Sequence, residues 1–401
     1  MKIGIVRERK SPSESRTPLT PTQVSYLRKE GKMDIVIQTS PHRCYPDKAF
    51  QELEVPVVRD LQECDVLMGI KEVPVKYLLA NKTYFFFSHT VKKQPHNRPL
   101  LMHVLNKNIT LVDYELITNT HGDRLVAFGH HAGIVGAHNA LWTWAQRTKS
   151  FSLPRLRDLP SYTAAKELYN ELHLPAIKII LAGTGRVGTG ALAALQAMGI
   201  QSVDPRAFLI ENYTFPVFCQ LMPHHYIEAK NGDTFDKGVF YSDPSTFVSS
   251  FLPYARSGDV MINGIYWRQG APPFFTLDQM CADEFHLQVI ADISCDLAPQ
   301  SSIPSTIRTA TIDDPVYGFD ACSATEKPPF QDHWVDMMCI DNLPNELAKE
   351  SSQAFGEQLI KQVMQHLVHG DPKEILHRAT IASGCKLMPA YSYLQDWLAA
   401  G

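Results

Sequence analysis

The sequence predicts an α/β protein of two domains, each built on a mostly parallel sheet, with a cleft between them. Three observations lead to this prediction. A chain of 401 residues is too long for one compact core. Short apolar runs alternate with helix-like segments in both halves of the chain, a pattern typical of βαβ units. A glycine-rich loop joins a strand-like run to a helix-like segment in the second half.

The composition narrows the range of partners. Hydrophobic residues make up 44% and charged residues 20% of the chain, which is the balance of a globular protein. The formal net charge of −4 gives no electrostatic reason to expect nucleic acid or an anionic membrane as a partner. No apolar run of about 18 residues appears, so the sequence predicts no membrane span. The N-terminus begins with a strand-like run and lacks a signal-peptide pattern.

The eight cysteines are scattered and form no CxxC pair. This spacing argues against a zinc site, and we expect no metal. It is typical of free thiols in a reducing compartment, so the sequence predicts a cytoplasmic protein.

The first half of the chain is predicted to hold strands separated by helical segments. The expected strands are 2–6, 34–38, 65–70, 83–87 and 109–112. Residues 21–31 predict a helix, because Pro21 suits a first helical turn. Residues 132–146 are rich in small side chains and predict a long helix, whose glycines would let another helix approach closely.

A second series follows a connecting segment at 150–163. Its expected strands are 176–182, 260–263 and 289–293. Residues 204–258 are polar and carry prolines, so we expect an insertion between core strands there.

The glycine loop lies at the end of the first strand of this second series. Gly183, Gly185 and Gly188 form a GxGxxG pattern that includes Arg186 and Val187. The first glycine makes a tight turn, the second lets a pyrophosphate approach the backbone, and the third lets helix and strand pack closely. The phosphate is then expected at a helix N-terminus. The pattern predicts a Rossmann-like dinucleotide-binding domain, and a glycine-rich turn without a ligand is the alternative.

The acid that would bind the ribose is less distinct. Asp204 lies about 20 residues after the loop begins, where a carboxylate meets the ribose 2′-hydroxyl of NAD. Arg206 is placed to receive the 2′-phosphate of NADP instead, and Asp204 before Pro205 also reads as an ordinary turn. The sequence favours NAD, with NADP as the alternative.

Three polar side chains in the first half suggest chemistry. Lys71 and His89 each follow a strand, at the edge where open α/β sheets build their sites. A lysine and a histidine facing one cleft suit a carbon–nitrogen bond, since amine oxidation needs a base and imine hydrolysis needs a group that moves water's protons. Arg16 is a candidate clamp for a carboxylate. The alternatives are a solvated Lys71–Glu72 pair, a core histidine and a capped surface turn.

These residues carry a resemblance to a known family. The segments Phe-Ser-His-Thr at 87–90 and Ile-Asp-Asn-Leu-Pro at 340–344 are the most specific. Further matching stretches run along most of the chain, at 16–21, 69–72, 86–95, 111–115, 124–129, 132–137, 183–188 and 291–294. On these motifs the sequence resembles the alanine dehydrogenase/transhydrogenase superfamily, and within it the lysine-forming saccharopine dehydrogenase and lysine–ketoglutarate reductase family.

The resemblance implies roles for individual residues. It gives Lys71 and His89 the acid–base steps, and it places Asp341 near the nicotinamide and ribose. It implies that the dicarboxylate and lysine pockets are lined by Arg16, Lys92, Gln94, Glu115 and Arg124. It also implies two Rossmann-like domains, in which 1–131 plus 345–401 hold the substrate and 132–344 hold the dinucleotide.

The implied activity is that of an NAD(P)-dependent oxidoreductase acting on a CH–NH group, which deaminates saccharopine reversibly to lysine and 2-oxoglutarate. An alanine-dehydrogenase-like or opine-forming enzyme is a second hypothesis, and a non-catalytic cofactor-binding protein is a third. The expected partners are small amino acids and 2-oxo acids. The sequence leaves open the oligomeric state, including a homo-oligomer, and the physiological direction.

Overall fold

The computed structural model describes residues 1–11 and 13–399, and it divides the chain into two compact units. The first unit contains Met1–Phe128 with Ala348–Gly401, and the second contains Gly129–Leu347. These limits lie a few residues from the domain limits expected from the sequence. Residues 12, 400 and 401 fall inside the expected first domain but lie outside the described part.

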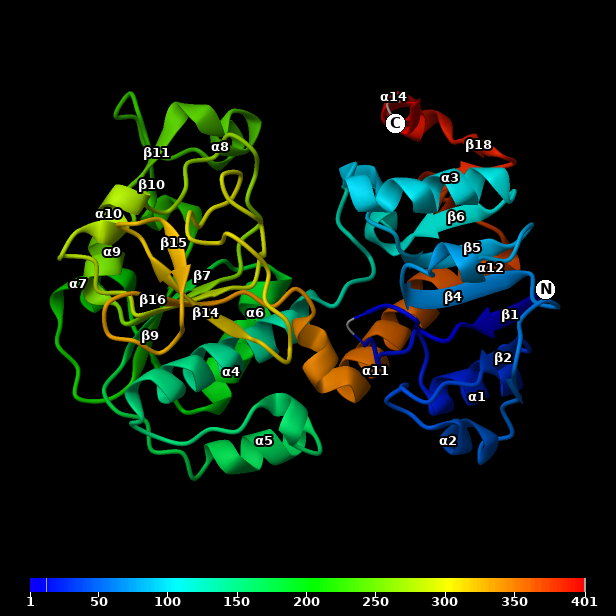
Figure 1. The fold of residues 1–401 in the computed structure, drawn as a ribbon, viewed down its shortest axis with the longest axis horizontal. Helices are drawn as coiled ribbons and strands as arrows, with labels where there is room; N and C mark the ends of the chain where they lie inside the picture. Colours follow the sequence, from blue (N-terminus) through cyan, green and yellow to red (C-terminus); the bar gives the residue numbers. More distant parts are fainter. Residues whose placement is uncertain (12, 400–401) are drawn as a thin grey trace. The chain divides into compact units, whose positions relative to one another are not determined.

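The first unit is built on an eight-stranded sheet in the order β18-β17-β6-β5-β4-β1-β2-β3. Neighbouring strands from β6 to β3 are parallel, whereas β17 and β18 are antiparallel. The strands are β1 Lys2–Ile5, β2 Asp34–Gln38, β3 Val57–Val58, β4 Val66–Lys71, β5 Thr83–Phe87, β6 Thr110–Asp113, β17 Thr380–Ser383 and β18 Lys386–Leu387. In Figure 1 the orange and red C-terminal segment lies among the blue and cyan strands of this unit. The C-terminal segment thus contributes the two strands β17 and β18 to the sheet of the first unit.

Helices cover both faces of this sheet. They are α1 Pro21–Lys29, α2 Asp47–Gln51, α3 Arg98–Asn106, α11 Ala348–Leu359, α12 Gln365–His369, α13 Ile375–Ala379 and α14 Gln395–Ala399, with a π-helical turn at Ile360–Met364. Helix α1 begins where its sequence dictates. Thr20 and Gln23 form a capping box, in which each side chain bonds the other's backbone N–H, and Pro21 occupies the first turn.

The second unit is built on another eight-stranded sheet, in the order β15-β14-β16-β13-β12-β7-β9-β8. Its strands are β7 Lys178–Ala182, β8 Gln201–Ser202, β9 Val217–Leu221, β12 Val260–Asn263, β13 Val289–Asp292, β14 Val316–Asp320, β15 Thr325–Lys327 and β16 Val335–Met338. Only β14 and β15 run antiparallel to their neighbours. The prediction of an α/β fold with two mostly parallel sheets is confirmed, while the cleft between the domains stays a prediction.

The helices of the second unit are α4 Gly129–Thr148, α5 Tyr162–Tyr169, α6 Arg186–Ala197, α7 Pro205–Ile210, α8 Lys237–Ser242, α9 Leu252–Ser257 and α10 Leu277–Cys281. The small residues of α4 bring it against α6, as expected. A Cβ on Gly133 would lie 1.9 Å from the carbonyl oxygen of Val187, and one on Gly190 would lie 1.9 Å from that of His130. No helix in the described part of the chain is both long enough and apolar enough to cross a membrane.

The stretch 204–258 differs from the insertion expected there. It contributes strand β9, which lies within the main sheet between β7 and the edge strand β8. Only the two-stranded sheet of β10 Ile227–Ala229 and β11 Phe247–Ser249, with the helices around it, stands outside the main sheet. Pro216 and Pro223 lie close to the two ends of β9. Because of these prolines, the segment was not predicted to contain a strand.

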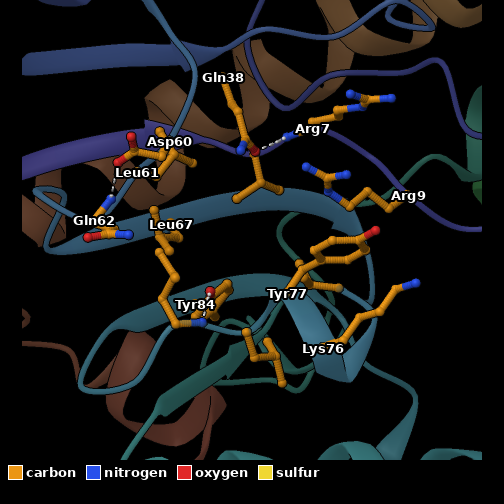
Figure 2. Close-up of a pocket in the computed structure, with 14 residues that line it drawn as sticks. Arg7, Arg9, Gln38, Asp60, Leu61, Gln62, Leu67, Lys76, Tyr77 and Tyr84 are labelled. Atoms are coloured by element: carbon orange, nitrogen blue, oxygen red, sulfur yellow. Dashed lines mark hydrogen bonds between the residues drawn. The ribbon is translucent and has the colours of Figure 1, made fainter.

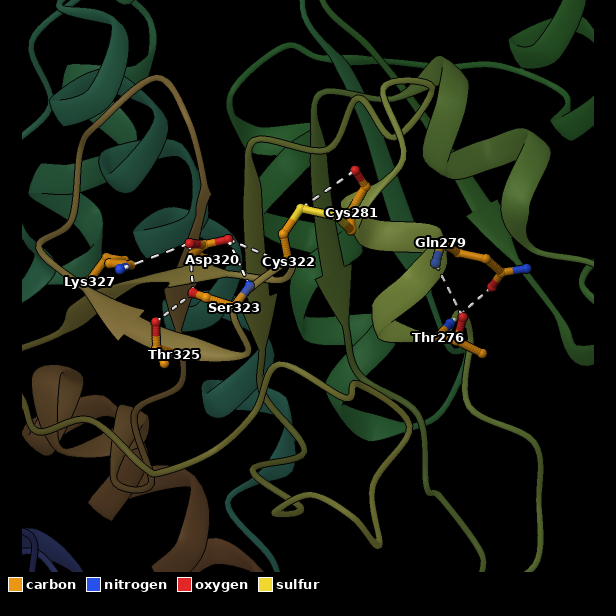
Figure 3. The surroundings of a disulfide bond; sticks show 8 residues. All are labelled: Thr276, Gln279, Cys281, Asp320, Cys322, Ser323, Thr325 and Lys327. Carbon is orange, nitrogen blue, oxygen red and sulfur yellow. Dashed lines mark hydrogen bonds and ion pairs between the residues drawn. A yellow bond between two sulfur atoms is a disulfide. The ribbon is translucent and has the colours of Figure 1, made fainter.

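The cysteines differ from expectation at one pair. Cys281, the last residue of α10, forms a disulfide with Cys322 in the turn between β14 and β15 (Figure 3). The other six cysteines are free thiols, as the sequence predicted. The bridge depends on two segments that meet only in the folded unit, so the spacing of the cysteines gave no sign of it. Because of this disulfide, the cysteines no longer indicate a reducing compartment. The cytoplasmic location stays a prediction.

Candidate active site

The candidate catalytic residues of the first unit lie at one edge of its sheet. Lys71 is the last residue of β4, His89 follows β5 by two positions, and Glu115 follows β6 by two positions. Because β4, β5 and β6 are parallel neighbours, their carboxyl ends meet at the same edge. The structure therefore places the predicted lysine and histidine on adjacent strand ends.

His89 is held firmly in an aromatic setting. Its backbone takes a left-handed conformation with φ of 53°, and its ring stacks on Phe87 with 6.5 Å between centroids. Burial lowers the pKa of His89 to about 4, and the positive charges of Lys71 and Lys92 add to the effect. His89 is therefore neutral near pH 7, the form that accepts a proton.

The depressed pKa of His89 predicts a pH dependence of stability. Its folded pKa of about 4 lies below the ordinary 6.5, so between these values the unfolded chain binds more protons than the folded one. The free energy of unfolding should fall as pH drops from 6.5 to 4. His89→Gln should flatten this slope in denaturant titrations across that window. The exposed His42, replaced in the same way, is the control, and an unchanged slope in His89→Gln would refute the assignment.

A charged cluster surrounds Glu115. Its Oε1 atom lies 3.6 Å from Nζ of Lys92 and accepts a hydrogen bond from Arg124. Burial alone would raise the pKa of Glu115, but Lys92 and Arg124 hold it below its usual value. The other carboxylate oxygen, Oε2, is buried and has no hydrogen-bond partner among the described residues. A buried acceptor without a partner is the arrangement expected where a ligand completes a site.

Gln94 was predicted to join this cluster. Its side chain is exposed and accepts a hydrogen bond from Nδ2 of Asn97, at 3.3 Å. Its role in substrate binding stays a prediction.

Arg16 is buried and paired inside the unit. Its Nε donates to Oε1 of Glu14 at 2.9 Å and its Nη2 donates to Oε2 at 2.7 Å, while the guanidinium lies over the ring of Phe128. Burial would raise the pKa of Glu14, but Arg16 lowers it to about 2. The guanidinium group of Arg16 was expected to clamp a substrate carboxylate. Two of its donors instead bind the carboxylate of Glu14.

Glu8 is a further residue of this edge that sequence reasoning missed. Its carboxylate accepts hydrogen bonds from the backbone N–H of Ile70 at 2.6 Å and of Lys71 at 3.2 Å. Burial raises its pKa to about 8, and the nearby Glu14 charge contributes. Glu8 thus fixes the end of β4 that carries Lys71. Glu8 and Glu14 precede α1 in an irregular segment. No motif or spacing in such a segment marks a single glutamate as a site residue.

The glycine loop of the second unit has the geometry that its pattern predicted. Gly183 has φ of 108°, and a Cβ on Gly188 would lie 2.2 Å from the carbonyl oxygen of Gly183. Gly185 is the N-cap of the twelve-residue helix α6, whose first residues are Arg186 and Val187. No described atom lies within 4 Å of a Cβ built on Gly185. The first N–H groups of α6 therefore face an open cradle that a side chain would fill, which fits a dinucleotide pyrophosphate.

Asp204 has another partner. Its carboxylate caps helix α7, accepting from the backbone N–H of Arg206 at 2.8 Å and of Ala207 at 3.4 Å. It follows β8, which β9 separates from the loop-bearing strand β7. This geometry agrees with the alternative reading of Asp204 as an ordinary turn residue before Pro205. Binding of the ribose by Asp204 stays a prediction.

Replacing Asp204 with alanine tests these two roles. Loss of an N-cap should cost about 1 kcal/mol of stability in a thermal or denaturant melt. We expect the affinities for NAD and NADP to stay unchanged, because the carboxylate is used within α7. A selective loss of NAD affinity would instead support contact with the ribose.

The carboxyl edge of the second sheet carries two further acids. Asp341 is exposed and lies just beyond β16, at the same edge as the glycine loop. Asp292, which had no assigned role, ends β13 and is fully buried. It accepts hydrogen bonds from Nδ2 of Asn263 at 2.8 Å and from Oγ1 of Thr306 at 2.6 Å. This network fixes the strand ends beside the loop, and contact of Asp341 with a cofactor stays a prediction.

Comparison with known proteins finds similarity to one domain family and to two groups of curated proteins. The model for the alanine dehydrogenase/PNT N-terminal domain matches residues 4–135. The chain is 30% identical to alpha-aminoadipic semialdehyde synthase of Arabidopsis thaliana, covering 98% of this chain and 41% of the relative. It is 27% identical to the NAD(+), L-lysine-forming saccharopine dehydrogenase of Schizosaccharomyces pombe, covering 90% of this chain and 91% of that one.

The solved structures agree on the fold. An L-alanine dehydrogenase matches with a TM-score of 0.65 and 15% identity, covering 99% of this chain and 100% of that one. The chain spans less than half the length of the first curated relatives that it matches. The chain is thus similar to the alanine dehydrogenase/PNT N-terminal domain over residues 4–135. Along most of its length it is similar to curated proteins named alpha-aminoadipic semialdehyde synthase and L-lysine-forming saccharopine dehydrogenase.

Proposed function

We propose that the protein is a nicotinamide-dependent saccharopine dehydrogenase of the lysine–ketoglutarate reductase type. It would convert saccharopine and water reversibly into lysine and 2-oxoglutarate. The observation that carries the proposal is the pair Lys71 and His89 on adjacent strand ends, with the charged group of Glu115 beside them. The names of the matched relatives point to the same substrate.

Lys71 takes the proton of the secondary amine in this proposal. Saccharopine joins the ε-nitrogen of lysine to the α-carbon of a glutaryl group, and oxidation of that bond needs the nitrogen unprotonated. Lys71 is partly buried and stands at a strand end that Glu8 fixes, and in its neutral form its amine is positioned to accept that proton. A bound nicotinamide would accept the hydride that leaves the α-carbon.

His89 serves the hydrolysis that follows. The oxidised carbon is an imine carbon, and water adds to it only when a base removes a proton from the attacking water. The neutral ring of His89 can take that proton. The same ring then returns a proton to nitrogen as the carbon–nitrogen bond breaks to release lysine and 2-oxoglutarate.

Substrate charges are matched by the cluster around Glu115. Lys92 and Arg124 supply positive charge for the carboxylates of the glutaryl part. The unpartnered Oε2 of Glu115 suits an ammonium group. The buried Arg16–Glu14 pair would orient this wall of the site rather than act as a free clamp.

The second unit supplies the dinucleotide cradle. We propose NAD as the cofactor, because the fungal relatives are named as NAD(+)-dependent enzymes, with NADP as the alternative. Strand β9, which pairs with β7 on the side of β8, ends at Leu221, without a carboxylate at its last position. The choice between the two cofactors therefore needs a direct comparison of both.

The test is the reductive direction with separated reactants. Lysine plus 2-oxoglutarate should oxidise the reduced cofactor, and omitting either compound should stop the reaction. Each cofactor is supplied in turn, and each amino acid and oxo acid is exchanged in turn. Consumption with pyruvate and ammonia would favour an alanine-type enzyme, and a different amino acid partner would favour an opine former. Cofactor binding without turnover in every combination would favour a non-catalytic protein.

A further inference from the structure

The first unit contains a cavity that the proposed reaction does not use. It encloses about 220 Å³, and its floor includes Val6, Leu67, Leu78 and Tyr84. Lys71 and His89 are not among its lining residues.

The cavity lies on one face of the sheet, and the aromatic residues near His89, Phe87 and Tyr114, pack on the other. Leu67 and Tyr84 belong to one hydrophobic cluster, whereas their chain neighbours Met68 and Phe85 belong to the other, with Tyr114. Successive side chains of a strand point to opposite faces, so the two clusters lie on opposite sides of the sheet. The cavity is therefore separate from the site around His89 and Tyr114.

Positive charge gathers at one end of this cavity. Arg7, Arg9 and Lys76 line it, against the single carboxylate of Asp60. Figure 2 shows the three cations on one side and Asp60 with Gln62 on the other. In the part of the chain that the structure describes, no ion pair is found for Arg7, Arg9 or Lys76.

Two of the three cations contact an aromatic ring rather than a carboxylate. The guanidinium of Arg9 lies 4.0 Å from the ring centroid of Tyr77, and Nζ of Lys76 lies 5.0 Å from it. The backbone N–H of Arg7 donates to Oε1 of Gln38 at 3.0 Å. Glu8 lies between the two arginines in sequence, but its carboxylate bonds the backbone of β4 and does not line the cavity. This end of the cavity therefore has positive charge that an anionic ligand would balance.

We propose that the cavity binds a small organic carboxylate, with its apolar body on the floor and its carboxylate among Arg7, Arg9 and Lys76. Guanidinium groups bind a carboxylate through two parallel hydrogen bonds, which a neutral ligand cannot form as strongly. The apolar floor excludes water below the head group and favours a short hydrocarbon or ring over a fully polar ion. The cavity is thus a ligand site separate from catalysis.

Benzoate is the probe, and neutral benzamide of nearly the same shape is the matched ligand control. Calorimetry on the full chain should detect benzoate at millimolar concentration and benzamide at least about tenfold more weakly. Arg9→Met and Arg7→Met should each weaken benzoate by about tenfold, with circular dichroism confirming the fold. Arg59→Met is the matched variant, since Arg59 is exposed and does not line the cavity.

Lys71→Met separates this cavity from the candidate active site. Benzoate affinity should be unchanged in that variant. Equal binding of benzoate and benzamide would overturn the proposal, as would full affinity in Arg7→Met and Arg9→Met. Absence of benzoate binding to the wild-type protein at tens of millimolar would overturn it as well, whatever the variants do.

Discussion

Replacing Lys71 with methionine is expected to lower kcat for saccharopine oxidation by about 100-fold or more, the usual contribution of a positioned proton acceptor. Methionine keeps the length of the side chain and removes only the amine. The cofactor cradle lies in the other unit, so the dissociation constant of the dinucleotide should not change. Steady-state kinetics and a fluorescence titration of the cofactor measure the two quantities.

The matched control is Lys82→Met. Lys82 is half-buried, lies just before β5, and donates to the carbonyl oxygen of Gln62. Its replacement should leave kcat unchanged. Turnover near the wild-type rate in Lys71→Met would remove the proposed proton acceptor.

Two glycine variants of the loop should lose dinucleotide affinity by different routes. Gly188→Ala forces a Cβ to within 2.2 Å of the backbone of Gly183, so the loop must shift. We expect a loss of about 1–3 kcal/mol in stability together with weaker cofactor binding. Gly185→Ala meets no described atom within 4 Å and should fold as well as the wild type. Its methyl group would occupy the cradle and weaken binding by about tenfold or more.

Melting curves with and without cofactor measure both effects. We expect Gly185→Ala to separate them, with stability retained and affinity lost. A Gly185→Ala protein that binds the dinucleotide like the wild type would show that the pyrophosphate does not lie over the start of α6.

Local patterns predicted the parts of the fold whose causes are local. The strands at 34–38, 83–87 and 260–263 have the predicted bounds, because buried parallel strands appear as continuous apolar runs between polar segments. The glycine loop was predicted from its immediate neighbours, since a tight turn and a close helix each demand glycine at fixed positions.

The rest depends on partners distant in sequence. Strand β17 pairs with β6, and no local pattern encodes that pairing. Arg16 was assigned to a substrate, but the fold buries it with Glu14 and against the ring of Phe128. Asp204 stands at the expected distance from the loop, yet β9 lies between its strand and β7. Spacing along the chain predicted the residue types of the site better than it predicted their partners.

The central claim is that the protein oxidises saccharopine at its secondary amine. The most direct measurement supplies saccharopine with NAD or NADP and quantifies all products. The account predicts reduced cofactor, lysine and 2-oxoglutarate in equal amounts, and no ammonia. Ammonia release, or reduced cofactor formed only from a simple amino acid such as alanine, would contradict it.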